Sequence, residues 1–280
     1  MTTTTPTRGT LKVPGARLYY EVRGAGPTLL LVGAPMDATA FAPLADLLAE
    51  DHTVVTTDPR GINRSTVTDP DADSTPDLRA HDLSRLLAEI GAGPAYVFGS
   101  SGGAVTALAL AQARPDQAHT VVAHEPPLEE LLDDREELRA RTDEMIAKHG
   151  AGDVVGAWRL FMAVANIDLL PGAVEEMFGG PRPAQVAADD RFQFAHMLRP
   201  TTSWQPDLAQ LRAATTRVVI GLGEESTGQL CARTSTALAV ALDTRPTAFP
   251  GGHIGFTENA PGFADRLRAI LAAVDRPPAT

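Results

Sequence analysis

Apolar runs of strand length alternate with stretches of helical spacing along most of the chain. A mostly parallel sheet with helices on both faces produces this alternation. Eight strands are expected, at Leu11–Val13, Arg17–Val22, Thr28–Val32, His52–Thr57, Ala95–Phe98, Thr120–His124, Arg217–Leu222 and Thr247–Phe249. Helical spacing is found at Phe41–Ala49, Asp77–Ile90, Gly102–Ala113 and Thr257–Ala273. The pattern predicts one α/β domain.

The alternation stops at residues 127–206, where the pattern is helical and contains no convincing strand. We interpret this stretch as a helical cap inserted between two strands, so that residues 1–126 and 207–280 form the core. The cap holds many of the large apolar side chains, and these pack the cap onto the sheet or line a substrate pocket. As substrate-binding residues we predict Met36 before the cap and, within it, Trp158, Phe192, Phe194 and Trp204.

A glycine-flanked serine is the most informative local motif. Gly99, Ser101 and Gly103 form Gly-x-Ser-x-Gly between a β-rich run and a helical run. This strand–turn–helix setting is typical of a nucleophile elbow, in which a sharp turn exposes the serine hydroxyl above the sheet. The alternatives are an ordinary Gly-rich turn that cradles phosphate, or Ser100 as the nucleophile, although Ser100 lacks the flanking glycines. The motif favours Ser101 as a covalent nucleophile.

A serine nucleophile needs a base that removes its proton. Of seven histidines, only His253 lies in a Gly-rich loop after the last predicted strand and before the last helix. That is where this fold delivers its base, and the order serine, acid, histidine also fits. His253 is therefore the predicted general base.

Two backbone N–H groups are expected to stabilise the oxyanion. The first belongs to Gly102, the residue after the nucleophile, and the second to the loop that follows Thr28–Val32. Pro35 in that loop has no N–H, so Ala34 is the candidate and Met36 the alternative.

More than one residue could be the acid that orients the base. The usual position, in the loop after the next-to-last strand, falls on Ser226, which cannot serve, and its neighbours Glu224 and Glu225 are alternatives. Glu125 follows the strand that ends at His124, at the carboxyl edge where catalytic groups gather in open α/β sheets. A glutamate there is long enough to reach His253 from one strand over. We favour Glu125 and keep Glu224 and Glu225 open.

Together these residues resemble the α/β-hydrolase superfamily over essentially the whole chain. Several stretches are similar to the fungal zearalenone lactonases, namely Phe98–Gly102, Pro115–Asp116, His124–Pro127 and Pro250–His253. The resemblance implies Ser101 as nucleophile, Glu125 as the acid that orients the base, and His253 as base. The oxyanion loop departs from that family's Asp-Gly pattern, and the cap is similar only loosely, so the resemblance does not carry over a substrate.

Composition and charge limit the partners and the cellular location that we expect for the protein. The formal net charge is −11, which disfavours nucleic acid and anionic membranes because both need a basic face. No apolar run approaches the length of a membrane span. The polar start lacks a signal-peptide pattern, and a lone cysteine suits a reducing compartment, so we expect a cytoplasmic protein. No histidine–cysteine cluster has metal spacing.

The sequence therefore predicts a cofactor-independent serine hydrolase without a metal, acting on an ester or lactone of a moderately large, hydrophobic substrate. Two alternatives stay open: cleavage of a carbon–carbon or amide bond by the same triad, or a non-catalytic ligand-binding relative. The expected partners are a small-molecule substrate and, in a homodimer, a second copy of the chain.

Overall fold

One open sheet forms the centre of the computed structural model, which describes residues 5–274. The strands are β1 (Thr7–Val13), β2 (Ala16–Arg23), β3 (Thr28–Val32), β4 (Thr53–Thr57), β5 (Thr66–Val67), β6 (Ala95–Ser100), β7 (Ala118–His124), β8 (Arg217–Gly223) and β9 (Thr247–Phe249). Their order is β1-β2-β4-β3-β6-β7-β8-β9, and β5 pairs with β2 outside this path. The predicted α/β-hydrolase sheet of eight strands is confirmed. The ninth strand, β5, is a two-residue addition.

The parallel part of the sheet runs from β4 to β9, while β1 and β2 form an antiparallel hairpin at its edge. In the centre, Leu30 of β3 pairs with Val97 of β6, and both side chains are fully buried. Strands covered on both faces read as continuous apolar runs, which is why this region was recognisable from sequence.

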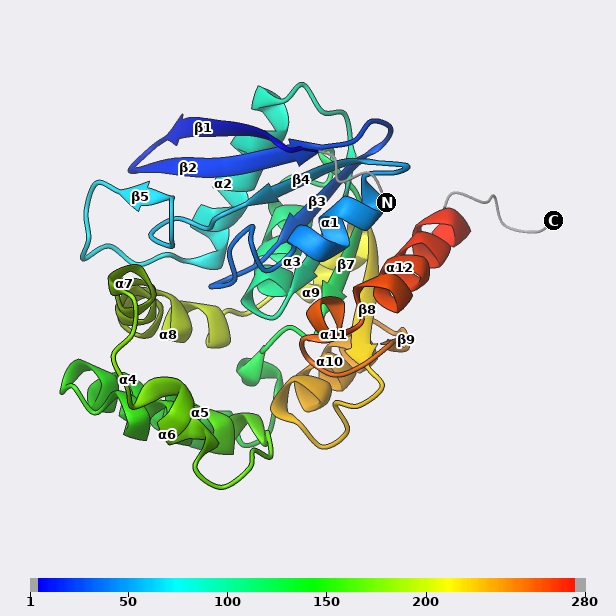
Figure 1. Ribbon diagram of the computed structural model, residues 1–280. Coiled ribbons are helices and arrows are strands. Elements are labelled where there is room, and N and C mark those ends of the chain that lie inside the picture. The colour runs from blue at the N-terminus through cyan, green and yellow to red at the C-terminus, as the bar shows by residue number, and fades with distance from the viewer. Residues whose placement is uncertain (1–4, 275–280) are drawn as a thin grey trace.

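Helices cover both faces of the sheet (Figure 1). They are α1 (Ala42–Leu48), α2 (Pro76–Glu89), α3 (Gly102–Ala113), α9 (Leu208–Ala213), α10 (Leu230–Ala241), α11 (Gly255–Glu258) and α12 (Ala260–Val274). Helices α1, α11 and α12 share one buried apolar cluster with the sheet. Helices α2, α3, α9 and α10 contribute to another. The two clusters place the helices in two layers with the sheet between them.

An aromatic cluster joins β6 to the end of the chain. Phe98 lies next to Phe263 with ring centroids 5.4 Å apart, and Phe249 stacks on Phe263 at 4.7 Å. Phe256 stacks on Phe41 of the segment before α1 at 4.9 Å. All five rings are fully buried. Edge-to-face and offset contacts of this kind add to the burial energy, and here they fix the residues that flank the turn after β6 and the loop after β9.

Between β7 and β8 the described chain contains helices and turns but no strand. The elements of residues 127–206 are the short 3₁₀ turn η1 (Glu129–Leu131), α4 (Arg135–Gly150), α5 (Val154–Ala165), α6 (Ala173–Phe178), α7 (Ala184–Phe192), the π-helical turn η2 (Gln193–Met197) and α8 (Leu198–Thr202). Figure 1 shows α4 to α8 gathered on one side of the molecule, beyond the carboxyl ends of the parallel strands. We call residues 127–206 the cap.

Polar contacts tie the cap to the core. The buried guanidinium of Arg79 in α2 donates to Thr106 of α3 and to Thr201 of α8, both at 2.9 Å. Asn166, after α5, donates to the carbonyl of Gly228, before α10, at 3.0 Å. Further contacts join Asn63 to Asp189 and Arg233 to Asp134, so the cap is held to the core at several points. No helix within residues 5–274 has the length and apolar character that crossing a membrane requires.

Candidate active site

Ser101 occupies the sharp turn between β6 and α3. Its backbone has φ 56° and ψ −127°, a conformation that side-chain-bearing residues rarely adopt. The turn leaves no room beside it: a Cβ on Gly99 would lie 2.4 Å from the carbonyl oxygen of Gly103, and a Cβ on Gly103 would lie 2.1 Å from that of Val32. These approaches explain why both flanking positions are glycine.

Ser100, the alternative nucleophile, faces elsewhere. It is fully buried, and its hydroxyl lies 3.1 Å from Nδ1 of His124. Burial lowers the pKa of His124 to about 4, so this imidazole is neutral at ordinary pH. The backbone N–H of Ser101 donates to the carbonyl of His124 at 2.9 Å, which fixes the elbow against β7.

Glu125 and His253 form a pair, as expected from the sequence. Nδ1 of His253 lies 2.6 Å from Oε2 of Glu125, and Oε1 of the same carboxylate accepts from the backbone N–H of Gly223 at 2.8 Å. Parallel pairing of β7 with β8 sets His124 opposite Gly221, which brings Glu125 beside the end of β8. The backbone of Glu125 has a positive φ of 52°, and its side chain is fully buried.

The pair favours the charged form of each partner. Burial by itself raises the pKa of Glu125, but the hydrogen bond with His253, the nearby imidazoles and the hydroxyl of Ser226 lower it to about 2. Burial also opposes a charge on His253. Interactions with Cys231 and with Glu125 outweigh it and raise the pKa of the imidazole to about 10. Ser226 is buried, whereas Glu224 and Glu225 are exposed.

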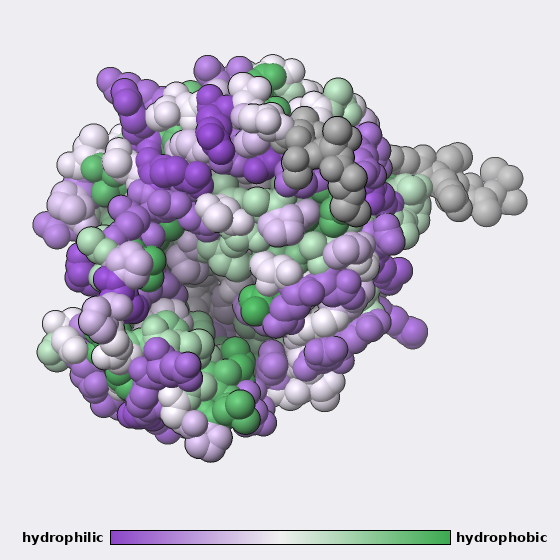
Figure 2. Space-filling view, viewed as in Figure 1, coloured by the Kyte–Doolittle hydropathy of each residue, from purple (hydrophilic) through white to green (hydrophobic). Residues whose placement is uncertain are grey.

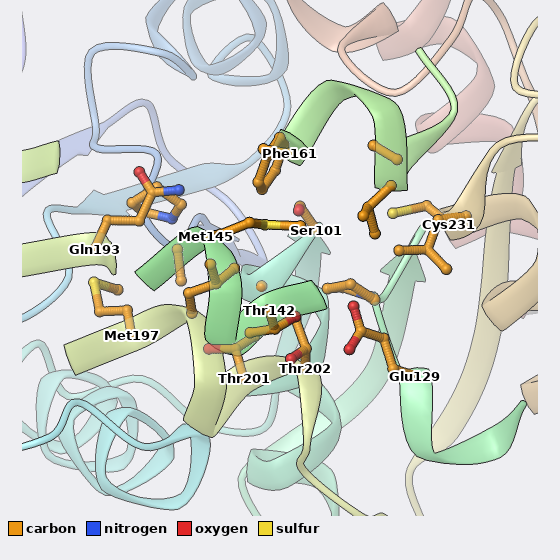
Figure 3. Close-up of a pocket in the computed structure, with 18 of the residues that line it drawn as sticks. Ser101, Glu129, Thr142, Met145, Phe161, Gln193, Met197, Thr201, Thr202 and Cys231 are labelled. Carbon is orange, nitrogen blue, oxygen red and sulfur yellow. The ribbon is translucent and has the colours of Figure 1, made fainter. Parts of the chain in front are cut away.

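Ser101 and His253 line one pocket between the core and the cap. Figure 2 shows it as a hollow on this face with hydrophobic residues around it. The cap contributes most of its apolar wall, namely Met145, Phe161, Val164, Ala165, Ile167, Met197 and Leu198. The polar side chains besides Ser101 and His253 are Glu129, Thr142, Gln193, Thr201, Thr202, Gln229 and Cys231, most of which are labelled in Figure 3.

Comparisons with known proteins show the family and the fold. A family model described as the alpha/beta hydrolase family matches residues 28–266. The chain belongs to the alpha/beta hydrolase family. It is 34% identical over 269 residues to the uncharacterised hydrolase YraK of Bacillus subtilis strain 168, covering 94% of this chain and 95% of that protein.

Two further relatives are more distant. A zearalenone hydrolase of Bionectria ochroleuca is 31% identical over 147 residues, which are 51% of this chain and 55% of that protein. The crystal structure of an alpha/beta hydrolase from Sphaerobacter thermophilus superimposes with a TM-score of 0.70 at 23% identity, covering 96% of this chain and all of that one. The latter shows a shared fold. The family model and YraK identify the chain as a hydrolase.

The expected oxyanion donors of this hydrolase lie at the pocket. Ala34 and Gly102 both line it, and the carbonyl oxygen of Ala34 packs so closely on Gly102 that a Cβ there would lie 2.4 Å away. Helix α3 begins at Gly102, so its N–H lies in the first turn, where an α-helix offers no internal acceptor. Met36, the alternative donor, does not line the pocket. It packs instead against the apolar cluster of α1 and α12.

The predicted substrate-binding side chains need correction, because none of the five lines this pocket. Trp158 stacks on Phe178 at 4.4 Å, and its indole N–H donates to Asp190 at 3.2 Å. Phe194 is fully buried and stacks on His149 at 4.4 Å. Both aromatic side chains therefore hold the cap helices together.

The other three also form packing contacts. Phe192 packs with Ala34, Ile62 and Met197. Trp204 belongs to the core cluster of α2 and α3, and its indole N–H lies 3.3 Å from the carboxylate of Asp77. Met36 packs against the apolar cluster of α1 and α12. Trp204 is buried, Phe192 and Met36 are half-buried, and none of the three lines the cavity.

Sequence reasoning missed two chemically active groups of the pocket. The Sγ of Cys231, one ligand atom of His253 and one of Glu125 all lie within 4.8 Å of one another. Cys231 reaches this place on the second residue of α10, and no local pattern indicates it. Glu129 is the other, a buried carboxyl in the pocket wall. The one sequence feature that could have indicated Glu129 is its position four residues after Glu125.

Proposed function

We propose that this alpha/beta hydrolase is a serine hydrolase that cleaves an ester or lactone of a hydrophobic substrate through an acyl-enzyme. One observation carries the proposal: the strained, glycine-flanked Ser101 opens into the same apolar pocket as a His253 whose Nδ1 lies 2.6 Å from the buried carboxylate of Glu125. Nucleophile, base and acid are the three roles of a hydrolytic triad.

In the proposed first step, Oγ of Ser101 attacks the substrate carbonyl carbon while Nε2 of His253 takes the hydroxyl proton. Glu125 accepts from Nδ1–H, which holds the imidazole in the tautomer that leaves Nε2 free and stabilises the imidazolium. The N–H groups of Gly102 and Ala34 stabilise the oxyanion, each contributing roughly 3–4 kcal/mol. The imidazolium then protonates the departing alkoxide, and the C–O bond of the ester breaks.

In the second step, water attacks the acyl carbon while His253 removes one of its protons. The tetrahedral intermediate collapses, the proton passes to Oγ of Ser101, and the carboxylic acid leaves. The chain and water supply every group in this cycle, so the proposed mechanism needs no cofactor. The apolar wall supplied by Met145, Phe161 and Leu198 favours uncharged, hydrophobic acyl or alcohol groups.

The test uses an alkyl p-nitrophenyl phosphonate, which a nucleophilic serine attacks at phosphorus with loss of p-nitrophenolate. We expect one equivalent of label on the wild type and on Ser100→Ala, none on Ser101→Ala, and the label on the peptide that contains Ser101. Turnover of p-nitrophenyl butyrate should fall by at least 10³-fold in Ser101→Ala. A Ser101→Ala protein that keeps more than a tenth of the rate would refute the nucleophile.

The same experiment separates the alternatives. A non-catalytic ligand-binding relative would not be labelled stoichiometrically, because it has no activated serine. A carbon–carbon or amide hydrolase would be labelled but would turn over esters and lactones no faster than its preferred bond, which a matched ester–amide pair measures.

A further inference from the structure

Glu129 is a buried carboxyl group that the proposed mechanism does not use. It lies on η1, four residues after Glu125, and only 4% of its surface is exposed. It lines the same pocket as Ser101. In Figure 3 its carboxyl group points into the cavity toward Thr142 and Thr202.

The two buried carboxyl groups of this region have opposite surroundings. Glu125 accepts from a backbone N–H and from an imidazole. Within residues 5–274 no lysine, arginine or histidine pairs with Glu129. The carboxylates of Glu130 and Asp134 disfavour its ionised form, and the hydroxyls of Thr202 and Thr142 favour it.

Such a carboxyl is costly for the folded chain. Burial, assisted by Glu130 and Asp134, raises the pKa of Glu129 to about 7 despite the two threonines. A buried carboxyl without a cationic partner gives up hydration that two hydroxyl groups replace only in part. Around it the wall is apolar, including Met145, Phe161 and Leu230. Ligand pockets of this type use a few polar groups to fix the orientation of an otherwise apolar ligand.

We propose that Glu129, flanked by Thr142 and Thr202, forms an acceptor subsite that binds a hydroxyl group of the substrate away from the scissile carbonyl. This inference rests on the proposed function, because it assigns the class of ester or lactone that the pocket accepts. The substrate is then a hydrophobic ester or lactone that carries one hydroxyl group. Glu129 is a specificity-determining residue and takes no part in bond breaking.

A hydroxyl fits this subsite better than an ammonium group does. A hydroxyl donates to the ionised carboxylate and also accepts from the protonated acid, so it binds in both forms that Glu129 takes near neutral pH. The two threonine hydroxyls supply further donors and acceptors of the same kind. An ammonium group would interact with the ionised form alone, and the apolar wall would remove its water without replacing it.

The experiment compares p-nitrophenyl esters of unbranched ω-hydroxy acids with the corresponding unsubstituted acids, over a range of chain lengths, and with ω-amino acids. At the chain length that spans the two groups, we expect the wild type to favour the hydroxy ester by about 10- to 100-fold in kcat/KM, as for a hydrogen bond to a charged group. Glu129→Leu should abolish this preference and raise kcat/KM for the unsubstituted ester.

Glu130→Gln is the matched control, since Glu130 is next in sequence, lies on the same turn and does not line the pocket. It should keep the preference. Turnover of the unsubstituted ester reports the proposed function by itself, so its absence in every variant and the wild type would overturn that function. If the unsubstituted ester is hydrolysed, three results overturn the subsite: no preference at any length, a preference that survives in Glu129→Leu, or a preference for the amino ester. A merely structural Glu129 would alter the melting temperature and both esters equally.

Discussion

Identical side chains acquire different chemistry from their neighbours in this site. Glu125 and Glu129 are four residues apart and both buried. Donors from Gly223 and His253 keep the pKa of Glu125 near 2, whereas burial among carboxylates raises the pKa of Glu129 to about 7. The charge of the neighbours decides the direction, imidazoles beside Glu125 and carboxylates beside Glu129, so one glutamate is suited to orient a base and the other to meet a ligand.

The first prediction concerns the acid. Glu125→Gln should preserve the fold and reduce kcat on the order of 10⁴-fold, because an amide in this place supports the wrong imidazole tautomer. Glu224→Gln and Glu225→Gln, at exposed positions, should be near neutral. The measurement is steady-state turnover of p-nitrophenyl butyrate, with circular dichroism as the control for folding. Loss of activity in Glu224→Gln or Glu225→Gln alone would assign the role of the acid to the loop after β8.

The second prediction concerns the thiol beside the base. Interactions with Cys231 and Glu125 raise the pKa of His253 above its ordinary value of 6.5. The base must be neutral to accept a proton, so a raised pKa shifts the rising limb of kcat/KM to higher pH. Cys231→Ala removes one of the two causes and should therefore shift this limb to lower pH. The check is a pH–rate profile of both proteins. An unchanged limb would mean that the thiol does not influence the imidazole.

At the scale of elements, buried rings align the parts of the chain that carry the proposed triad. β6 leads into Ser101, and the segment from β9 to α11 carries His253. Phe98 of β6 and Phe256 of α11 are in contact, with ring centroids 6.2 Å apart. Distances within the triad thus depend on side chains that do not touch the substrate.

The third prediction tests this dependence. Phe256→Ala removes a fully buried ring and should lower the free energy of unfolding by about 3–5 kcal/mol. Because Phe256 follows His253 by three residues, kcat should also fall, while Phe256→Leu should lose less of both. Val240→Ala, at a side chain that is 74% exposed, is the matched control. Urea unfolding and turnover measure the two effects. Full activity in a destabilised Phe256→Ala protein would mean that this ring stabilises the fold but does not align His253.

For the molecule as a whole, the core was predictable and the cap interior was not. Gly99–Gly103 and the loop at His253 are local patterns, and the strands before them are continuously apolar, so the sheet and the triad candidates could be read from sequence. The two-residue β5 is too short to show any period. Trp158 and Phe194 are apolar on helices that have neighbours on several sides, and sequence does not tell which side faces the cavity. Glu129 becomes buried only once α4 and α8 cover it.

The fourth prediction concerns stability and pH. The folded-state pKa of Glu129 is about 7, above the ordinary 4.5. The native state therefore binds this proton more tightly, and the contribution of Glu129 to stability declines as pH rises through the window from 4.5 to 7. Glu129→Gln does not titrate. Its free energy of unfolding relative to the wild type should increase between pH 4 and pH 8 by up to ~3 kcal/mol. Urea unfolding at both pH values measures this, and an unchanged difference would contradict the raised pKa.

The proposed acid, Glu125, directly follows β7, and this placement leaves a second position open for a carboxylate. Ser226, in the loop after β8, is buried beside the Glu125 carboxylate, and a carboxylate at that position would approach the same imidazole. The single substitution Ser226→Asp would thus give the chain two carboxylates beside this imidazole. We expect Glu125→Gln combined with Ser226→Asp to turn over esters faster than Glu125→Gln alone. Equal rates would mean that a carboxylate at position 226 does not replace Glu125.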